Sequence, residues 1–500
     1  MDDDIKQVLL ARVYDVAIES PITEAPKLSA RSGAAVYLKR EDMQPVHSFK
    51  LRGAYNCLIH MSPEERQRGV VAASAGNHAQ GVALAAARLG VSATIVMPRT
   101  TPEIKVDAVR SHGARVILTG DSFNDAYTHA MHLVTVEGAT FMHPFDDPRV
   151  IAGQGTIGRE ILEQLPEVTH IYVPVGGGGL IAGIAMYVKQ LRSEVQIIGV
   201  EPTDSNVMQR SLALGERVTL DYVGIFAEGV AVKQAGAHTF GIAQKYVDRV
   251  ITVSTDEICA AIKAVYEDTR SIQEPAGALS VAGLMREQLP GNAKAVAICS
   301  GANVTFERLQ QVAERTLLGS HREVLVAITM PEVPGALHQF CTSILDGHAI
   351  TEFNYRLARR HEAHILVGIT VADTDDRVAF LQRLARNSYR YTDLSDDDLT
   401  KEHIRHMIGG VAADAQAEHT YQINFPERPG ALGDFLTTLG ERWNISVFHY
   451  RNQASDTGNV LIGFEAPDQE MLERQLNEVG YDWTRVDDSP AMRLFIAAPG

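Results

Sequence analysis

Short apolar runs rich in β-branched residues recur over the first 305 residues, and helical stretches separate them. The runs fall at residues 35–38, 69–73, 93–97, 114–118, 171–175, 196–200 and 295–299. Strands that are apolar on both faces belong in a mostly parallel sheet covered by helices. We therefore expect an α/β fold here, with ligands bound just beyond the carboxyl ends of the strands.

Four consecutive glycines, residues 176–179, lie where one of these strands passes into a helical stretch. Because glycine has no Cβ, the backbone can curl until several N–H groups converge, and the helix N-terminus adds positive partial charge. Such a loop binds a phosphate. The spacing fits neither the dinucleotide fingerprint nor the Walker pattern. Taken alone, the run is explained equally well by a plain tight turn.

Composition limits the classes of function. A chain of 500 residues predicts more than one domain. The net charge of −16, without a basic stripe, argues against binding to nucleic acid or to an anionic membrane surface. The acidic start and the lack of a long apolar run predict a cytoplasmic protein. Four scattered cysteines, without metal-ligand spacing, fit a reducing compartment: Cys57, Cys259, Cys299 and Cys341.

The chain after about residue 320 contains an internal repeat. Three pairs of blocks are each 95 residues apart: PEVPGAL at 331 and PERPGAL at 426, FNYR at 353 and FHYR at 448, ILVG at 365 and VLIG at 460. Each unit is expected to run strand, Pro-Gly turn, helix, strand, strand, helix, and residues 394–418 are expected to connect the two. The repeat therefore predicts two tandem α+β modules.

Three further segments place polar side chains near strand ends: SFKLRGA at 48–54, SAGNHAQG at 74–81 and SGAN at 300–303. Ser48 is expected to cap a helix, which puts Lys50 in the first turn. The helix dipole disfavours a cation at this position. A lysine is therefore unexpected there unless its amine is used in covalent chemistry with a carbonyl. The alternative is an ordinary solvated lysine.

The other two segments each allow a binding and a structural interpretation. Asn77 can donate to a ligand oxygen or form a local cap. Ser300 can hydrogen-bond a heterocyclic nitrogen or lie in a simple turn. His78 has no partner at ligand spacing, so we interpret it as structural and expect no metal site.

In this order, the four segments resemble those of the tryptophan-synthase-β-like (fold type II) family of pyridoxal-phosphate enzymes. Within it the chain is similar, over nearly its whole length, to the threonine ammonia-lyases of the long biosynthetic form. The resemblance implies a two-lobed catalytic domain over residues 1–318 and pyridoxal 5′-phosphate as cofactor. It makes Lys50 the catalytic lysine, with Asn77 at the cofactor's phenolic oxygen and Ser300 at its pyridine nitrogen. The implied phosphate loop comprises Gly176, Gly177, Gly178, Gly179 and Leu180.

Residues 322–393 and 417–488 resemble the ACT-like regulatory modules of the same enzymes. In that family they bind isoleucine as inhibitor and valine as antagonist, and the enzyme is a homotetramer. The alternative is that the modules only support oligomerisation. Ala302 departs from the glycine found in many relatives, which leaves the shape of that loop open.

The resemblance implies deamination of L-threonine, with L-serine as a further substrate, to 2-oxobutanoate and ammonia in the first step of isoleucine biosynthesis. Lys50, once displaced by the substrate amine, would be the general base. A neutral Ser300 makes the cofactor ring a weaker electron sink, which favours β-elimination over transamination. Segments expected near substrate or cofactor are 145–147, 152–156, 228–229 and 273–277.

Other functions remain as alternatives. A serine/threonine racemase shares the lysine and the glycine loop but needs an acid on the opposite face, where such relatives carry serine and this chain has Ala75. A serine dehydratase differs only in substrate preference. A sulfur-amino-acid synthase would use a different phosphate loop. A non-catalytic amino-acid sensor would keep the modules but would not need Lys50.

Overall fold

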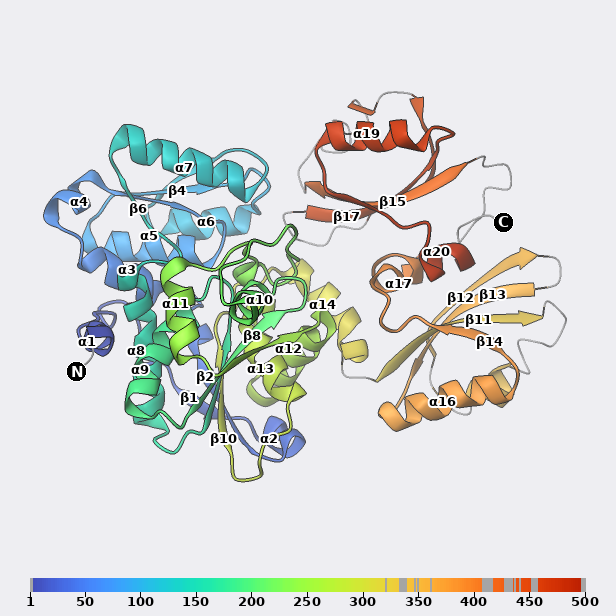
Figure 1. The fold of residues 1–500 in the computed structure, drawn as a ribbon, viewed down its shortest axis with the longest axis horizontal. Coiled ribbons are helices and arrows are strands. Elements are labelled where there is room, and N and C mark those ends of the chain that lie inside the picture. The colour runs from blue at the N-terminus through green and yellow to red at the C-terminus, as the bar shows by residue number, and fades with distance from the viewer. Residues whose placement is uncertain are drawn as a thin grey trace. The chain divides into compact units, whose positions relative to one another are not determined.

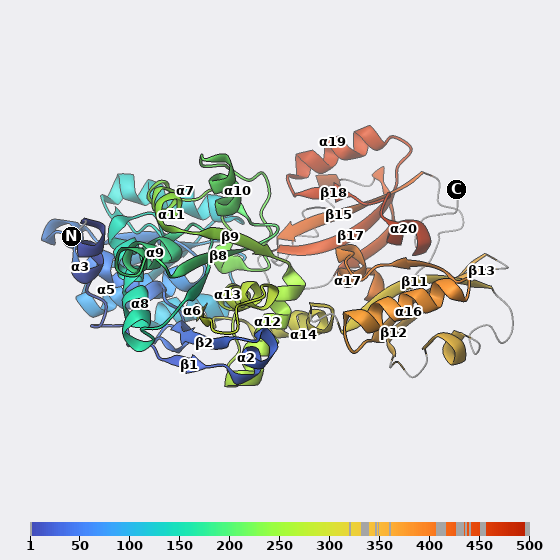
Figure 2. The same ribbon diagram turned by 60° about the horizontal axis from the view of Figure 1, so that its bottom comes forward.

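The computed structural model describes residues 3–319, 322–331, 340–345, 348, 350–359, 362–406, 417–426, 435, 438–439, 442–450 and 457–495. The chain divides into two compact units, Met1–Phe306 and Glu307–Gly500. Figures 1 and 2 show the ribbon from two directions. The first unit is α/β and the second holds two α+β modules, as the sequence predicts.

The first unit contains a six-stranded sheet in the order β1-β2-β10-β7-β8-β9. All neighbouring strands are parallel except β1 and β2. The strands are β1 (Ile22–Glu24), β2 (Ala35–Arg40), β7 (His170–Pro174), β8 (Gln196–Pro202), β9 (Arg249–Val253) and β10 (Lys294–Cys299). The expected mostly parallel sheet is thus confirmed, with one antiparallel strand at its edge.

A second, four-stranded sheet forms the other lobe, in the order β5-β4-β3-β6, and all its pairs are parallel. Its strands are β3 (Val70–Ala73), β4 (Ala93–Met97), β5 (Arg115–Leu118) and β6 (Thr140–Phe141). Buried side chains of α3, α5 and α6 pack on one face and those of α7 on the other. These helices are α3 (Lys50–Ile59), α5 (Asn77–Leu89), α6 (Glu103–Ser111) and α7 (Phe123–Glu137).

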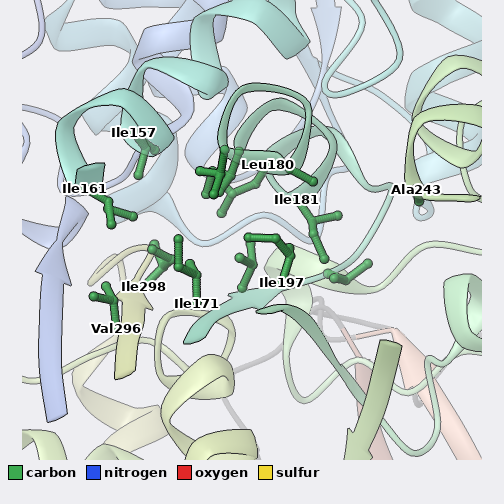
Figure 3. Close-up of a cluster of buried hydrophobic side chains, with 14 of the residues drawn as sticks. Ile157, Ile161, Ile171, Leu180, Ile181, Ile197, Ala243, Val296 and Ile298 are labelled. Carbon is green, nitrogen blue, oxygen red and sulfur yellow. The ribbon is translucent and has the colours of Figure 1, made fainter. Parts of the chain in front are cut away.

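The core of the larger lobe lies between its sheet and two helices, α8 (Pro148–Gln164) and α9 (Gly179–Leu191). Figure 3 shows Ile157 and Ile161 of α8 and Ile181 of α9 above the strand residues Ile171 and Ile197. Each such side chain contributes about 1.5–3 kcal/mol when it is fully buried. Because side chains alternate along a strand, Tyr172 points to the opposite face, where its hydroxyl donates to Glu287.

The remaining helices of this unit surround the two lobes. They are α1 (Asp3–Leu9), α2 (Pro26–Ser32), α4 (Pro63–Arg68), α10 (Val207–Leu214), α11 (Ala237–Tyr246), α12 (Thr255–Thr269) and α13 (Pro275–Arg286). Helix α13 packs on β7, β8, β9 and β10. The sheet therefore has helices on both faces, which explains why its strands are apolar throughout.

Helices α8 and α9 can approach closely because glycines face each other where they cross. A β-carbon on Gly183 would lie 2.4 Å from the carbonyl oxygen of Ile151, and one on Gly155 would lie 2.9 Å from the carbonyl oxygen of Gly183. Both distances are too short for any side chain. The crossing thus holds α9, and with it the glycine run at its start, tightly against α8.

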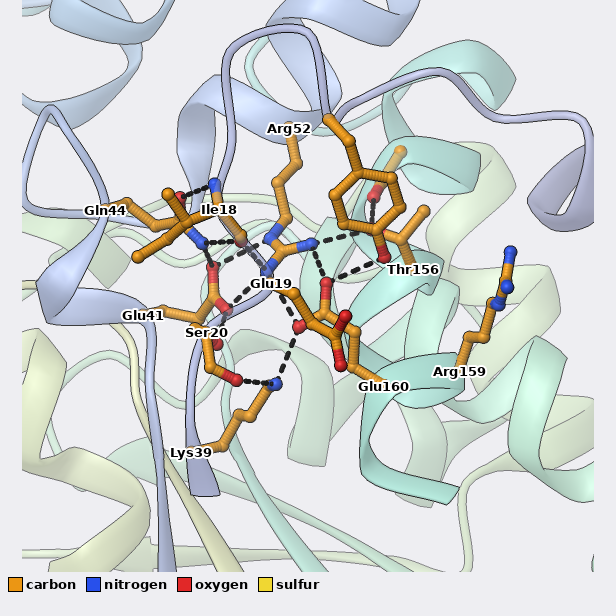
Figure 4. Close-up of polar contacts among 12 residues, drawn as sticks. Ile18, Glu19, Ser20, Lys39, Glu41, Gln44, Arg52, Thr156, Arg159 and Glu160 are labelled. Atoms are coloured by element: carbon orange, nitrogen blue, oxygen red, sulfur yellow. Dashed lines mark hydrogen bonds and ion pairs between the residues drawn. The ribbon is translucent and has the colours of Figure 1, made fainter. Parts of the chain in front are cut away.

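A buried ionic cluster fixes α3 against α8 and β2 (Figure 4). Arg52 of α3 donates to Glu41 (2.8 Å) and to Glu160 of α8 (2.5 Å), and all three side chains are 0–1% exposed. Lys39 of β2 donates to the other oxygen of Glu160 at 2.6 Å. Tyr14 also donates to Glu160. Two cations and two carboxylates, all nearly inaccessible to solvent, therefore neutralise one another.

The second unit contains two four-stranded antiparallel sheets of equivalent order, β12-β13-β11-β14 and β16-β17-β15-β18. The first comprises β11 (Glu323–Pro331), β12 (Ile350–Arg359), β13 (Glu362–Thr370) and β14 (Arg390–Asp393). The second comprises β15 (Glu418–Pro426), β16 (Asn444–Tyr450), β17 (Thr457–Glu465) and β18 (Trp483–Arg485). Helices α16 (Thr374–Arg386) and α19 (Gln469–Val479) follow β13 and β17. A π-helical turn (Cys341–Leu345) precedes β12.

The strand registers repeat with the same spacing as the sequence blocks. Ile328 pairs with Ile365 in the first module, and Ile423 pairs with Val460 in the second. A register shift after Ile350 in β12 recurs after Ile445 in β16. The predicted duplication is therefore confirmed down to an irregularity of the backbone.

Each module differs from the predicted unit in its last element. The expected unit ended with a helix, but each module adds a further strand, β14 or β18, along β11 or β15. This is a correction: the strand is short and polar, so its sequence lacks the apolar pattern of the others. The Pro-Gly turns at 331–337 and 426–432 lie, apart from their first residue, outside the described residues.

The connector between the modules contains helix α17 (Asp398–Glu402), whereas helix α14 (Phe306–Gly319) precedes the first module and helix α20 (Pro490–Phe495) ends the second. Connector residues Leu394 and Leu399 share a buried cluster with Leu366 of β13, Leu461 of β17 and Met492 of α20. Within the described part of the chain, no helix has the length and apolar character needed to cross a membrane.

The ionic cluster generates a stability prediction. Glu160→Ala leaves Lys39 and Arg52 buried with a single carboxylate, that of Glu41, to balance them, so it should lower the free energy of unfolding by about 3–5 kcal/mol. Urea denaturation followed by circular dichroism measures this. Glu163→Ala is the matched control on the same helix, because Glu163 is 53% exposed in its pair with Arg159, and it should cost less than about 1 kcal/mol. Equal effects of the two substitutions would contradict the prediction.

Candidate active site

The glycine run connects β7 to α9, at the carboxyl end of the larger sheet. Gly178 occupies the N-cap position with φ +93°, a conformation that disfavours other residues, and no side chain caps the helix. The first N–H groups of α9 are therefore left for a ligand. Packing requires glycine at Gly177 as well, because a β-carbon there would lie 2.4 Å from the Phe145 ring.

A second helix holds the glycine loop from outside. The Thr239 hydroxyl of α11 donates to the Gly177 carbonyl at 2.6 Å. The Asp146 carboxylate accepts from backbone N–H groups of Ala237, His238 and Thr239, and so caps α11. Asp146 follows Phe145 in the chain, so one short segment both packs on the glycines and anchors the helix that supports them.

Lys50 is the first residue of α3, as expected, but the cap predicted for that helix is wrong. The N-cap position is Phe49, without a capping side chain, and the Ser48 hydroxyl is buried without a hydrogen-bond partner in the structure. The reason is a long-range contact. Ser48 forms a β-bridge with Gly301, and the Phe49 N–H donates to the Ser300 carbonyl at 3.2 Å. This pairing brings Lys50 beside Ser300.

The Lys50 amine lies in the wall of a cavity and donates to the Pro144 carbonyl at 3.2 Å. Burial lowers the pKa of Lys50 to about 8, although the Glu274 carboxylate opposes this shift. The amine is therefore much more often neutral at physiological pH than an ordinary lysine. A neutral amine is the form that attacks a carbonyl group or accepts a proton.

Asn77 begins α5, and its side chain is not a cap. Its amide nitrogen donates to Glu274 at 2.6 Å, and its amide oxygen accepts from Asn303 at 2.7 Å. Ser300, 4% exposed, donates to the Ala276 carbonyl at 3.3 Å. The neighbouring His78 is buried and bonds the Met142 carbonyl at 2.9 Å, which agrees with its structural interpretation.

One cavity brings the predicted site residues together. Its lining includes Lys50, Asn77, Gly176, Gly177, Gly178, Gly179, Leu180 and Ser300, together with Phe49, Pro144, Phe145, Gln154, Pro174, Gly229, Val230, Glu274 and Ala276. Among the described residues of this lining, Lys50 is the single amine and Glu274 the single carboxylate. Burial raises the pKa of Glu274 to about 7, against the lowering effect of the Asn77 amide.

The lining fits pyridoxal phosphate by the chemistry of its donors. An uncapped helix N-terminus suits a phosphate, an amine suits an aldehyde, and an amide and a hydroxyl suit the oxygen and nitrogen of the ring. The Gln154 amide oxygen is buried in the same wall and has no hydrogen-bond partner in the structure. A donor on a bound molecule would satisfy this acceptor. No cluster of three potential metal ligands occurs in the described residues.

For several lining residues the sequence predicts only the segment in which they lie. Phe145, Gln154, Gly229, Glu274 and Ala276 fall in stretches expected near substrate or cofactor, yet no local pattern singled out one residue in them. The signal available for Gln154 is a polar residue within the mostly apolar stretch 150–158 of α8. For Glu274 it is a charged residue directly before the Pro-Ala-Gly start of α13, a helix that is buried from Pro275 to Leu284.

Comparisons with known proteins agree with this geometry. Residues 13–301 match the family described as pyridoxal-phosphate dependent enzymes, and residues 314–404 and 409–496 match the C-terminal regulatory domain of threonine dehydratase. The chain is 50% identical, over 99% of both lengths, to the biosynthetic L-threonine dehydratase of Burkholderia multivorans. It is 47% identical to that of Escherichia coli, over 99% of this chain and 97% of the relative.

A solved structure resembles a large part of the chain. The processed form of threonine deaminase isoform 2 from Solanum lycopersicum aligns with a TM-score of 0.62 and 50% identity, over 63% of this chain and 88% of that one. With its catalytic cavity, its duplicated regulatory unit and these full-length relatives, the chain belongs to the biosynthetic threonine dehydratases, a family of pyridoxal-phosphate-dependent enzymes.

Proposed function

We propose that this protein deaminates L-threonine, and L-serine as a second substrate, releasing 2-oxobutanoate from threonine together with ammonia. The observation that carries the proposal is the convergence of an amine of lowered pKa, an uncapped helix N-terminus and a neutral hydroxyl in one cavity. The near full-length identity to biosynthetic L-threonine dehydratases supports threonine as substrate and isoleucine biosynthesis as the pathway.

The proposed roles follow from the chemistry of each group. Residues 176–180 hold the cofactor phosphate, Asn77 donates to the ring oxygen and Ser300 faces the ring nitrogen. When bound, pyridoxal phosphate supplies an aldehyde for the amino group and a ring that withdraws electrons from Cα. Lys50 holds the cofactor in the resting enzyme and, once released, takes the Cα proton on Nζ.

Two residues, Ser300 of the cavity and Ala75 of a neighbouring loop, favour elimination over other outcomes. Ser300 is a neutral hydroxyl that bonds a carbonyl, so it cannot keep a full positive charge on the ring nitrogen as a carboxylate would. Ala75, in the loop after β3, has no proton to donate. A racemase needs an acid opposite the lysine, so racemisation is at most a side reaction, although maize serine racemase shares the fold (TM-score 0.59, 33% identity).

The second unit is proposed to bind isoleucine as inhibitor and valine as antagonist. The match of both modules to a threonine dehydratase regulatory domain supports control by a small molecule. We further propose residues 1–318 as the catalytic domain, 322–393 and 417–488 as the regulatory modules, a homotetramer as the assembly and the cytoplasm as the location. The alternative function, a non-catalytic amino-acid sensor, does not explain why a cavity holds a lysine of lowered pKa.

Removal of the Lys50 amine should separate enzyme from sensor. Lys50→Ala is expected to lower 2-oxobutanoate formation from threonine by at least about 10³-fold, since both the covalent link and the base are lost. The purified variant should also lack the visible absorption of a covalently bound cofactor. Lys27→Ala, at an exposed lysine, is the control. Full activity in Lys50→Ala would refute the mechanism.

The lowered pKa of Lys50 predicts how fast apoprotein takes up cofactor at different pH. Only the neutral amine attacks the aldehyde, so the rate constant should rise about tenfold per unit below pH 8 and level off above it. Absorbance at the visible band, followed after mixing from pH 6 to 9.5, measures it. A rate constant that is still rising tenfold per unit at pH 9.5 would indicate an ordinary lysine.

Feedback control predicts that isoleucine reduces 2-oxobutanoate release several-fold at subsaturating threonine, because effector binding is coupled to substrate binding at a second site. Added valine should restore the release. A continuous assay on the full chain with threonine, then with serine, tests both the effector and the substrate range. Activity that isoleucine does not change would contradict the proposed role in isoleucine biosynthesis but not the lyase activity itself.

A further inference from the structure

The Asn77 side chain is held by two partners that lie far away in sequence. Its amide nitrogen donates to Glu274 Oε1 at 2.6 Å, and its amide oxygen accepts from Asn303 Nδ2 at 2.7 Å. The Asn303 nitrogen also donates to the Val46 carbonyl at 2.8 Å. Three segments of the first unit thus meet at one amide group in the cavity wall.

The Val46 carbonyl decides which way both amides point. A carbonyl oxygen only accepts, so the group of Asn303 that faces it must be the NH₂. The same NH₂ faces Asn77, so Asn77 must present its oxygen there and its own NH₂ on the opposite side. An asparagine NH₂ carries two hydrogens. One is used by Glu274, and the second is left for a group in the cavity.

Glu274 is placed for this contact rather than for a helix cap. It occupies the N-cap position of α13, yet its side chain makes no capping hydrogen bond. Its backbone N–H donates to the Gly301 carbonyl at 3.1 Å, which ties it to the Ser300 segment. A β-carbon on Gly301 would lie 2.5 Å from Glu274 Oε1 and 3.2 Å from Asn77 Nδ2. Glycine at position 301 therefore leaves the space that the Asn77 and Glu274 side chains occupy, and any larger residue there would collide with them.

We propose that Glu274 is a positioning residue that, with Asn303, orients the Asn77 amide so that an N–H faces the ring oxygen of bound pyridoxal phosphate. The inference rests on the proposed function, since it concerns the same cavity. Without the Glu274 acceptor, the amide loses one of the contacts that hold it. It can then turn its oxygen toward an anionic ring oxygen, and that arrangement is repulsive.

The test compares Glu274→Ala and Glu274→Gln in the holoenzyme. Glutamine keeps an oxygen that accepts from Asn77, whereas alanine removes it. For Glu274→Ala we expect the cofactor dissociation constant to rise about tenfold or more. Its visible band should also lose intensity to a band at shorter wavelength, as the ring oxygen takes up a proton. Glu274→Gln should retain most of the wild-type affinity and spectrum.

Two further variants make the test specific. In an Asn77→Ala background, Glu274→Ala should add almost nothing, because a residue that acts through Asn77 has nothing left to position. Glu267→Ala is the charge-matched control: Glu267 lies outside the cavity lining, is 38% exposed and pairs with Lys263 at 3.7 Å. Its removal should leave the cofactor spectrum unchanged.

The outcomes separate this inference from the function on which it rests. Wild-type protein that binds no pyridoxal phosphate would refute the proposed function itself. An active wild type with an unaltered spectrum in Glu274→Ala would refute only the positioning role. So would Glu274→Gln failing as severely as Glu274→Ala, since that result assigns the effect to the charge or proton of Glu274 instead of its acceptor oxygen.

Discussion

The geometry of the cavity depends on the buried pairing of Arg52 with Glu41 and Glu160. Arg52 lies two residues after Lys50 on α3, and its guanidinium bonds the carboxylate of Glu41, directly after β2, and that of Glu160 on α8. Reacting groups must be held within about 0.5 Å of their working positions. A helix held at its first turn only by apolar contacts could slide, whereas hydrogen-bonded ions fix both its rotation and its depth. The cluster stabilises the fold little in net terms, because desolvation offsets much of the attraction, but it makes one arrangement far better than its neighbours.

The features that the sequence predicted well are those carried by local chemistry. The strand-to-helix junction at Gly176 depends on a few adjacent residues, whereas Lys50 begins α3 as predicted although the cap predicted for that helix is wrong. The duplicated modules were visible because spaced blocks recur, and the strand registers follow them. The burial of β7 and β10 followed from their unbroken apolar runs.

The features that the sequence did not reveal depend on partners far along the chain. Ser48 has the composition of a cap, but its backbone pairs with Gly301, so tertiary pairing overrode the local preference. The role proposed for Glu274 depends on its hydrogen bond with Asn77, which is 197 residues away in the sequence. A single sequence carries no signal for such a pair, since each residue alone is an ordinary polar residue near a helix start.

The shared apolar cluster of the second unit bears on how two modules can act as one. Along β13, Ile365 and Val367 pack under α16, while Leu366 points to the other face of the sheet. Its counterpart in the repeat, Leu461, does the same in β17. These second faces meet in one cluster with the connector residue Leu394 and with Met492. A sheet face cannot shift without disturbing side chains that pack at close to crystal density. A ligand that bends one module would therefore act on side chains against which the other module also packs.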